Sequence, residues 1–70
     1  MAMKYYAYYR LYDHDPSYHF RVDAGVFERR TPATRSWVKV THKLGRDFLS
    51  RAIENGDGAF PMTDEEVAQL

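Results

Sequence analysis

Alternating side chains near the start of the chain predict a first β-strand over residues 3–12. Successive side chains of a strand point to opposite faces of a sheet. The odd-numbered positions hold Met3, Tyr5, Ala7, Tyr9 and Leu11. The even-numbered positions hold Lys4, Tyr6, Tyr8, Arg10 and Tyr12. Because the odd set is uncharged and the even set carries cations, we expect the odd face to cover the core and the even face to meet solvent.

Shorter alternating segments follow and predict an antiparallel meander. Residues 13–17 contain Asp, Pro and Ser and are typical of a turn. Residues 18–23 predict a second strand, with Tyr18, Phe20 and Val22 on one face. Gly25 is expected to supply a positive φ in a tight hairpin that leads into a third strand over residues 26–30. Residues 37–40 favour a short fourth strand, and the alternative is an extended lead into a helix.

The apolar period changes to three and four residues over positions 42–55, which predicts an amphipathic helix. Its apolar stripe consists of Leu44, Phe48, Leu49, Ala52 and Ile53. Thr41 is the expected N-cap and Gly56 the expected left-handed stop. We interpret residues 57–61 as a loop whose Phe60 anchors on the core. Residues 62–67 fit a capping box with a hydrophobic staple, which predicts a short terminal helix.

These elements predict an α+β fold. A three- to four-stranded antiparallel meander packs on one C-terminal amphipathic helix, and a short terminal helix follows. The 70 residues are expected to form one small domain, because domains rarely fall below about 50 residues. No apolar run approaches the roughly 20 residues of a membrane span, and the first residues lack a signal-peptide core. We therefore expect a cytoplasmic protein that does not insert into membranes.

Charge is distributed unevenly although ten basic residues balance ten acidic ones. All basic residues lie between Lys4 and Arg51, whereas the last 19 residues contain only acidic charges. A basic body with an acidic tail suggests a charged partner, or contact between tail and body. The chain has no Cys, which excludes disulfides and Cys-based zinc sites. Because small domains without such cross-links often gain stability by association, we expect a homodimer.

Two groups of residues are candidate binding sites. The predicted solvent face of the first strand combines cations with aromatic rings and predicts an interaction face formed by Lys4, Tyr6, Tyr8, Arg10 and Tyr12. Candidate contacts for phosphate or an acidic partner are Arg29, Arg30 and Arg35. We predict a non-catalytic protein-interaction module, and the alternative is nucleic-acid binding through the same face. The zero net charge disfavours that alternative, since non-specific nucleic-acid affinity comes from neutralising phosphates.

Catalytic and metal-binding patterns are weak in this sequence. The three histidines, His14, His19 and His42, leave a small ribonuclease as a third hypothesis. There is no nucleophile motif and no glycine-rich phosphate loop. The acidic and histidine residues of positions 13–19 lack the spacing of a helical metal site, so we interpret them as a solvated turn. We expect no enzyme activity, no cofactor and no metal.

A loose motif comprises residues 21–23, residues 25–29, Trp37 and residues 63–67. This motif resembles one found in short uncharacterised actinobacterial and actinophage proteins. This resemblance implies no activity, cofactor or catalytic residue. The predicted order of three strands and a helix is also similar in layout to the DNA-binding domains of plant transcription factors and the arm-binding domains of integrases, which place their sheets on DNA.

Overall fold

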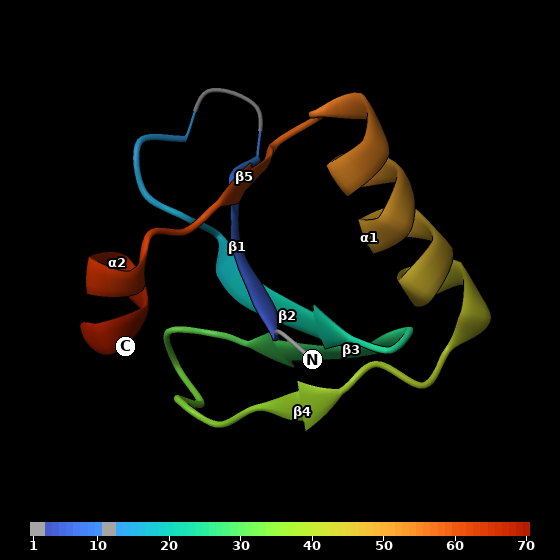
Figure 1. Cartoon of the computed structure of the whole chain (residues 1–70), viewed down its shortest axis with the longest axis horizontal. Helices are drawn as coiled ribbons and strands as arrows, with labels where there is room; N and C mark the ends of the chain where they lie inside the picture. The colour runs from blue at the N-terminus through green and yellow to red at the C-terminus, as the bar shows by residue number, and fades with distance from the viewer. Residues whose placement is uncertain (1–2, 11–12) are drawn as a thin grey trace.

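The chain folds into a five-stranded antiparallel sheet with two helices, and the α+β prediction is confirmed (Figure 1). The structure is a computed structural model that describes residues 3–10 and 13–70. Its elements are β1 Lys4–Tyr8, β2 Tyr18–Asp23, β3 Val26–Arg30, β4 Val38–Lys39, α1 Lys43–Asn55, β5 Ala59–Pro61 and α2 Asp64–Ala68. The strand order is β4-β3-β2-β1-β5. Predictions for Leu11 and Tyr12 lie outside the described residues.

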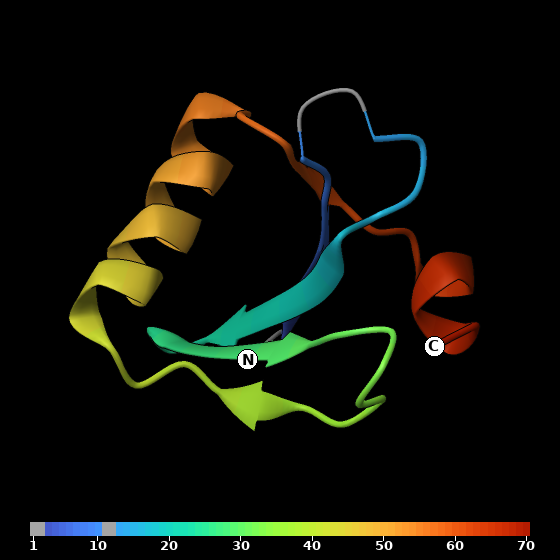
Figure 2. The ribbon, with the colours of Figure 1, turned by 180° about the vertical axis from the view of Figure 1, so that it is seen from behind.

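Helix α1 connects the two edges of the sheet. The meander β1 to β4 ends at one edge, and after α1 the chain returns as β5 at the other edge, antiparallel to β1. Figures 1 and 2 show α1 on one side of the sheet and α2 on the other. We call the face under α1 the inner face and the opposite one the outer face. The predicted short fourth strand is confirmed as β4.

The predicted orientation of β1 is wrong, because its even-numbered side chains face α1. Tyr6 pairs with Phe20 across the strands, and their rings stack with centroids 5.1 Å apart. Phe20 is fully buried and Tyr6 is 9% exposed. The rings at positions 6 and 8 bring more apolar area to the core than Ala7 can, and burial is roughly proportional to that area. Lys4 and Arg10 flank the buried part of the strand and remain exposed, so their charges do not decide the face.

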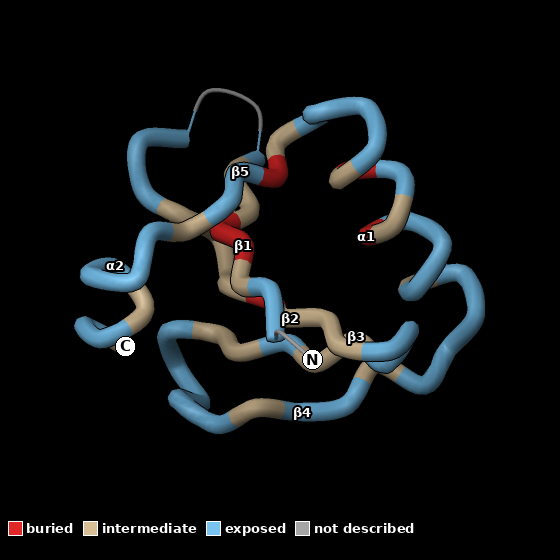
Figure 3. The backbone as a smooth tube through the Cα atoms, viewed as in Figure 1, coloured by how far each residue is buried: buried red, intermediate tan, exposed pale blue. Residues whose placement is uncertain are grey.

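The hydrophobic core lies between the inner face and the C-terminal half of α1 (Figure 3). Its buried cluster consists of Tyr6, Phe20, Leu49, Ala52 and Ala59. Partly buried side chains packed against it are Tyr8, Tyr18, Val22, Phe27, Val40 and Ile53. The first turns of α1 are not covered, since Leu44 is 71% and Phe48 50% exposed. The predicted apolar stripe of α1 is therefore buried only in its second half.

The ends of both helices are set by local hydrogen bonds. His42, not the predicted Thr41, is the N-cap of α1, because its Nδ1 accepts a bond from the Leu44 amide at 3.2 Å. Gly56 ends α1 in the left-handed region with φ 62°, as predicted. The predicted capping box of α2 is confirmed, because Thr63 and Glu66 exchange backbone-to-side-chain bonds of 2.9 and 3.2 Å.

Residues 59–61 form strand β5 rather than the predicted loop. Tyr8 pairs with Ala59, and Phe60, which was expected to anchor on the core, is 53% exposed. Gly58 permits the close approach of the two segments: a Cβ there would lie 2.7 Å from the Tyr9 carbonyl oxygen. The Tyr9 amide donates to the Gly58 carbonyl at 2.9 Å. The free edge of β1 thus supplies the pairing that stabilises this short strand.

The β2–β3 hairpin contains a strained backbone position that a substitution can relieve. Its two central residues, Ala24 and Gly25, have φ of 51° and 79°, the signs that a type I′ turn requires. Left-handed backbone costs a non-glycine residue about 1–2 kcal/mol, and asparagine tolerates it best. We expect Ala24→Asn to raise the free energy of unfolding by about 1 kcal/mol in urea titrations. The control is Ala33→Asn, at an exposed alanine without positive φ; equal effects of the two substitutions would contradict the strain.

Candidate functional site

The predicted interaction face of β1 is only partly available at the surface. Tyr6 is buried beneath α1, Tyr8 is half-buried, and Lys4 and Arg10 are exposed. Tyr12 lies outside the described residues. Because Tyr6 is removed from solvent, these residues do not form a continuous wet face, and the surface around Tyr8 must be built from other elements.

Tyr8 belongs to an aromatic stack on the inner face. Its ring stacks on Tyr18 of β2 with centroids 4.9 Å apart, and Phe48 of α1 meets it edge-on at 5.5 Å. Leu44 lies one turn before Phe48 on the same side of the helix. We call Tyr8, Tyr18, Leu44 and Phe48 the Tyr8–Phe48 patch. It joins exposed apolar side chains of α1 to the ring stack of the sheet.

Cations border this patch on its β3 side. The Arg29 guanidinium lies 5.4 Å from the centroid of the Tyr18 ring, in a cation–π contact. Burial raises the pKa of Tyr18, Tyr8 raises it further, and Arg29 and Arg10 oppose the shift. The Tyr18 phenol is therefore neutral at physiological pH and offers a hydrogen-bond donor beside two exposed arginines.

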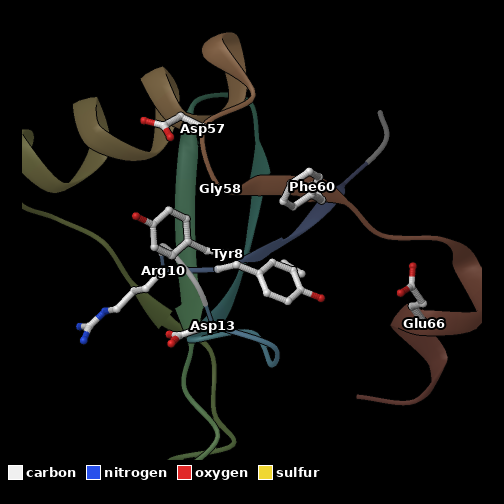
Figure 4. Close-up of a pocket in the computed structure, with 9 residues that line it drawn as sticks. Tyr8, Arg10, Asp13, Asp57, Gly58, Phe60 and Glu66 are labelled. Carbon is white, nitrogen blue, oxygen red and sulfur yellow. The ribbon is translucent and has the colours of Figure 1, made fainter.

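A groove with acidic walls borders the patch on its β5 side. It has a volume of about 690 Å³, and Tyr8, Tyr9 and Phe60 are part of its lining. The charged residues of the lining are Asp13, Asp57 and Glu66 with one cation, Arg10. Figure 4 shows Asp57 and Asp13 on opposite sides of Tyr8, with the Arg10 guanidinium directed away from the rings. Tyr9 and Phe60 meet edge-on at 5.7 Å and form its apolar wall. Across the sheet, the border of the patch thus changes from basic at β3 to acidic at β5.

The outer face carries a second aromatic and cationic group that is satisfied internally. The Arg21 guanidinium lies 4.3 Å from the centroid of the Trp37 ring, and its Nε donates to Glu28 Oε1 at 2.7 Å. Tyr5 meets Trp37 edge-on at 5.7 Å. Within residues 3–10 and 13–70, Arg21–Glu28 is the sole ion pair. Trp37 lies half-buried on this face.

The three candidate anion-binding arginines do not share a face. Alternation along β3 places Arg29 over Tyr18 on the inner face and Arg30 on the outer face. Arg30 and Arg35 come together in an outer-face hollow beside His19 and Leu70. Arg30 Nη2 donates to the Leu70 carbonyl at 3.2 Å, so the acidic terminal segment folds back on the basic body here.

The histidines of the ribonuclease hypothesis lie on different elements. His14 is in the loop before β2, His19 on the outer face, and His42 at the start of α1. No cluster of three metal-ligating side chains occurs in the part of the chain that the structure describes. Among the same residues, no helix has the length and apolar character to cross a membrane.

Comparisons with known proteins give no match: no protein-family model, no curated protein and no solved structure is significantly similar to this chain. A function for this chain is therefore inferred from its surfaces alone.

Sequence reasoning missed Tyr18 and Phe48 as surface residues. Tyr18 was placed on one face of the second strand with Phe20 and Val22, and Phe48 on the apolar stripe of the helix. Periodicity alone does not show which part of such a stripe the sheet covers.

His19 should report on the charge of the outer-face hollow. Burial, and secondly the neighbouring Arg30, lower the pKa of His19, while Glu66 opposes the shift. We expect Arg30→Gln to raise this pKa part of the way to the ordinary histidine value in an NMR titration of the imidazole. Because the folded-state pKa is depressed, the neutral ring favours folding, and its contribution to stability is lost as pH falls through that pKa.

The control for this titration is Arg46→Gln, an exposed arginine of α1, which should leave the pKa of His19 unchanged. A His19 pKa at or above the ordinary value in the unsubstituted protein would contradict the assignment.

Proposed function

We infer that this chain is a small non-catalytic protein-interaction module that forms a homodimer through the Tyr8–Phe48 patch. The exposure of Leu44 and Phe48 beside the Tyr8–Tyr18 stack carries this proposal. Adjacent apolar side chains on one helix, continuous with aromatic rings, are typical of the centre of a protein interface. Aromatic anchors of this kind contribute most of the binding energy in such interfaces.

Charge supports a second copy of the chain as the partner. The patch has exposed Arg29 at its β3 end and exposed Asp57 at its β5 end. A two-fold axis that lies in the interface, perpendicular to the line from β3 to β5, would place the basic end of one copy opposite the acidic end of the other. Since the net charge is zero, overall repulsion does not oppose association of identical chains.

The size of the core supports association as well. Among the described residues, Phe20 is the single large side chain with less than 2% exposure. A domain of this size buries only about 60% of the surface of its unfolded chain. Covering Leu44 and Phe48 with a second copy would extend the core across the dimer axis.

The nucleic-acid alternative has weaker geometric support. It requires Arg29, Arg30 and Arg35 to act with the face of β1. Arg29 lies on the opposite side of the sheet from Arg30, and Tyr6, which was to present its ring to a base, is buried.

Removing the Phe48 ring should dissociate the dimer. We expect Phe48→Ser to weaken dimerisation at least tenfold, because truncating a central aromatic anchor costs about 2 kcal/mol or more. Sedimentation equilibrium over a concentration series measures the change. The control is Val26→Ser on β3, which replaces a residue that is 44% exposed and that strand alternation places on the outer face with Arg30. A monomeric parent protein at high micromolar concentration would refute the proposed dimer.

Charge reversal tests the two-fold arrangement. Asp57→Arg should weaken the dimer by placing two cations together, and Arg29→Asp should weaken it by placing two anions together. The double variant restores opposite charges across the axis, so we expect it to recover most of the parent affinity at low salt. Additive losses in the double variant would contradict this orientation of the two copies.

A further inference from the structure

The outer face contains a concave site that the proposed dimer does not use. One hollow of about 320 Å³ is lined by Tyr5, Arg30, Arg35, Trp37, Val67 and Leu70. A second hollow of about 200 Å³ shares Arg30, Arg35 and Leu70 with it and adds His19 and Thr31 to the lining. Together they form one recess between the sheet, the β3–β4 turn and the end of the α2 segment. We call this recess the arginine pocket.

We propose that the arginine pocket binds a small aromatic oxyanion, with its phosphate or carboxylate group held by Arg30 and Arg35 and its ring placed against Trp37 and Tyr5. Guanidinium groups match such oxyanions because they donate parallel hydrogen bonds in a fixed planar fork. The volume is at the lower end of the range for ligand pockets, which fits a molecule of one or two rings.

No acidic side chain neutralises the pocket within the described part of the chain, because no Asp or Glu carboxylate there forms an ion pair with Arg30 or Arg35. Arg30 Nη2 donates to the Leu70 backbone oxygen at 3.2 Å, which fixes its position and leaves its other donors for a ligand. Two guanidinium groups in one concavity attract an anion from solvent.

The backbone also holds Arg35 in an unusual conformation. Arg35 has φ 55°, which is uncommon for a side chain of this size. Its amide donates to the Thr31 carbonyl at 3.0 Å, and the hydroxyls of Thr31 and Thr34 lie 2.8 Å apart. This closed turn maintains the strained residue at the mouth of the pocket. Strain of this kind is concentrated at functional sites.

The remaining walls include aromatic and aliphatic side chains. Arg21 stacks on Trp37, and Tyr5 meets it edge-on, so the indole is held in place from the sheet side. Val67 and Leu70 line the same hollow from the α2 side. A ring attached to the bound oxyanion would enter between these aromatic and aliphatic walls.

Trp37 is the single tryptophan of the chain, so its fluorescence reports on this pocket directly. The protein is titrated at low salt with phenyl phosphate, benzoate, inorganic phosphate and phenol. We expect saturable binding of phenyl phosphate or benzoate, and at least tenfold weaker binding of inorganic phosphate and phenol. The better of the two aromatic anions identifies the oxyanion. The absence of saturable binding of either, or equal binding of phenol, would overturn the proposal.

Substitutions test the site independently of the dimer. Arg35→Gln should weaken binding of the aromatic anion about tenfold or more, because it removes a charge-assisted pair of hydrogen bonds. Arg46→Gln removes an exposed arginine of α1 and should have no effect. Phe48→Ser should retain full binding, since Phe48 lies on the inner face, so failure of the dimer and failure of the pocket are separable. Equal affinities of the Arg35 and Arg46 variants would overturn the proposal.

Discussion

The stacking of Tyr6 on Phe20 is the contact on which both surfaces of the sheet depend. It places the even-numbered residues of β1 under α1 with Tyr6 against the buried ring of Phe20. A shift of one residue would turn every side chain of β1 to the other face. Tyr8 would then leave the patch, and Tyr5 would leave the wall beside Trp37. The aromatic pair in the core thus determines which rings remain for binding on each side.

Features encoded by neighbouring residues could be predicted from the sequence. The hairpin at Gly25, the end of α1 at Gly56 and the capping box of α2 each depend on side chains within a few positions of one another. The orientation of β1 could not be predicted in this way, since both of its faces are rich in apolar residues and its charges lie at the ends. Strand β5 has three residues, one of them Pro61, and it exists because β1 offers an unpaired edge from far away in the chain.

The residue types of the candidate sites could be predicted from the sequence better than their arrangement in the fold. Tyr8, Arg10, Arg30 and Arg35 were identified from their chemistry, and the structure assigns them to two opposite faces. The separation of Arg29 from Arg30 follows from strand alternation alone, so the sequence contained that information. The positions of Phe48 and Trp37 did not follow. They depend on how α1 lies across the sheet and on which face the residue before β4 takes.

The pairing of β1 with β5 brings residues 6–8 against residues 59–61, at nearly opposite ends of the sequence. During synthesis, β1 therefore leaves the ribosome before β5, the strand that pairs with it, has been made. Closure of the sheet must be among the final steps, and contacts between such distant segments are intrinsically slow to form. Until then, the edge of β1 is open to other chains. In the completed sheet the outermost strand includes Pro61, which has no amide hydrogen to donate, so the finished protein presents a less receptive edge than its nascent form.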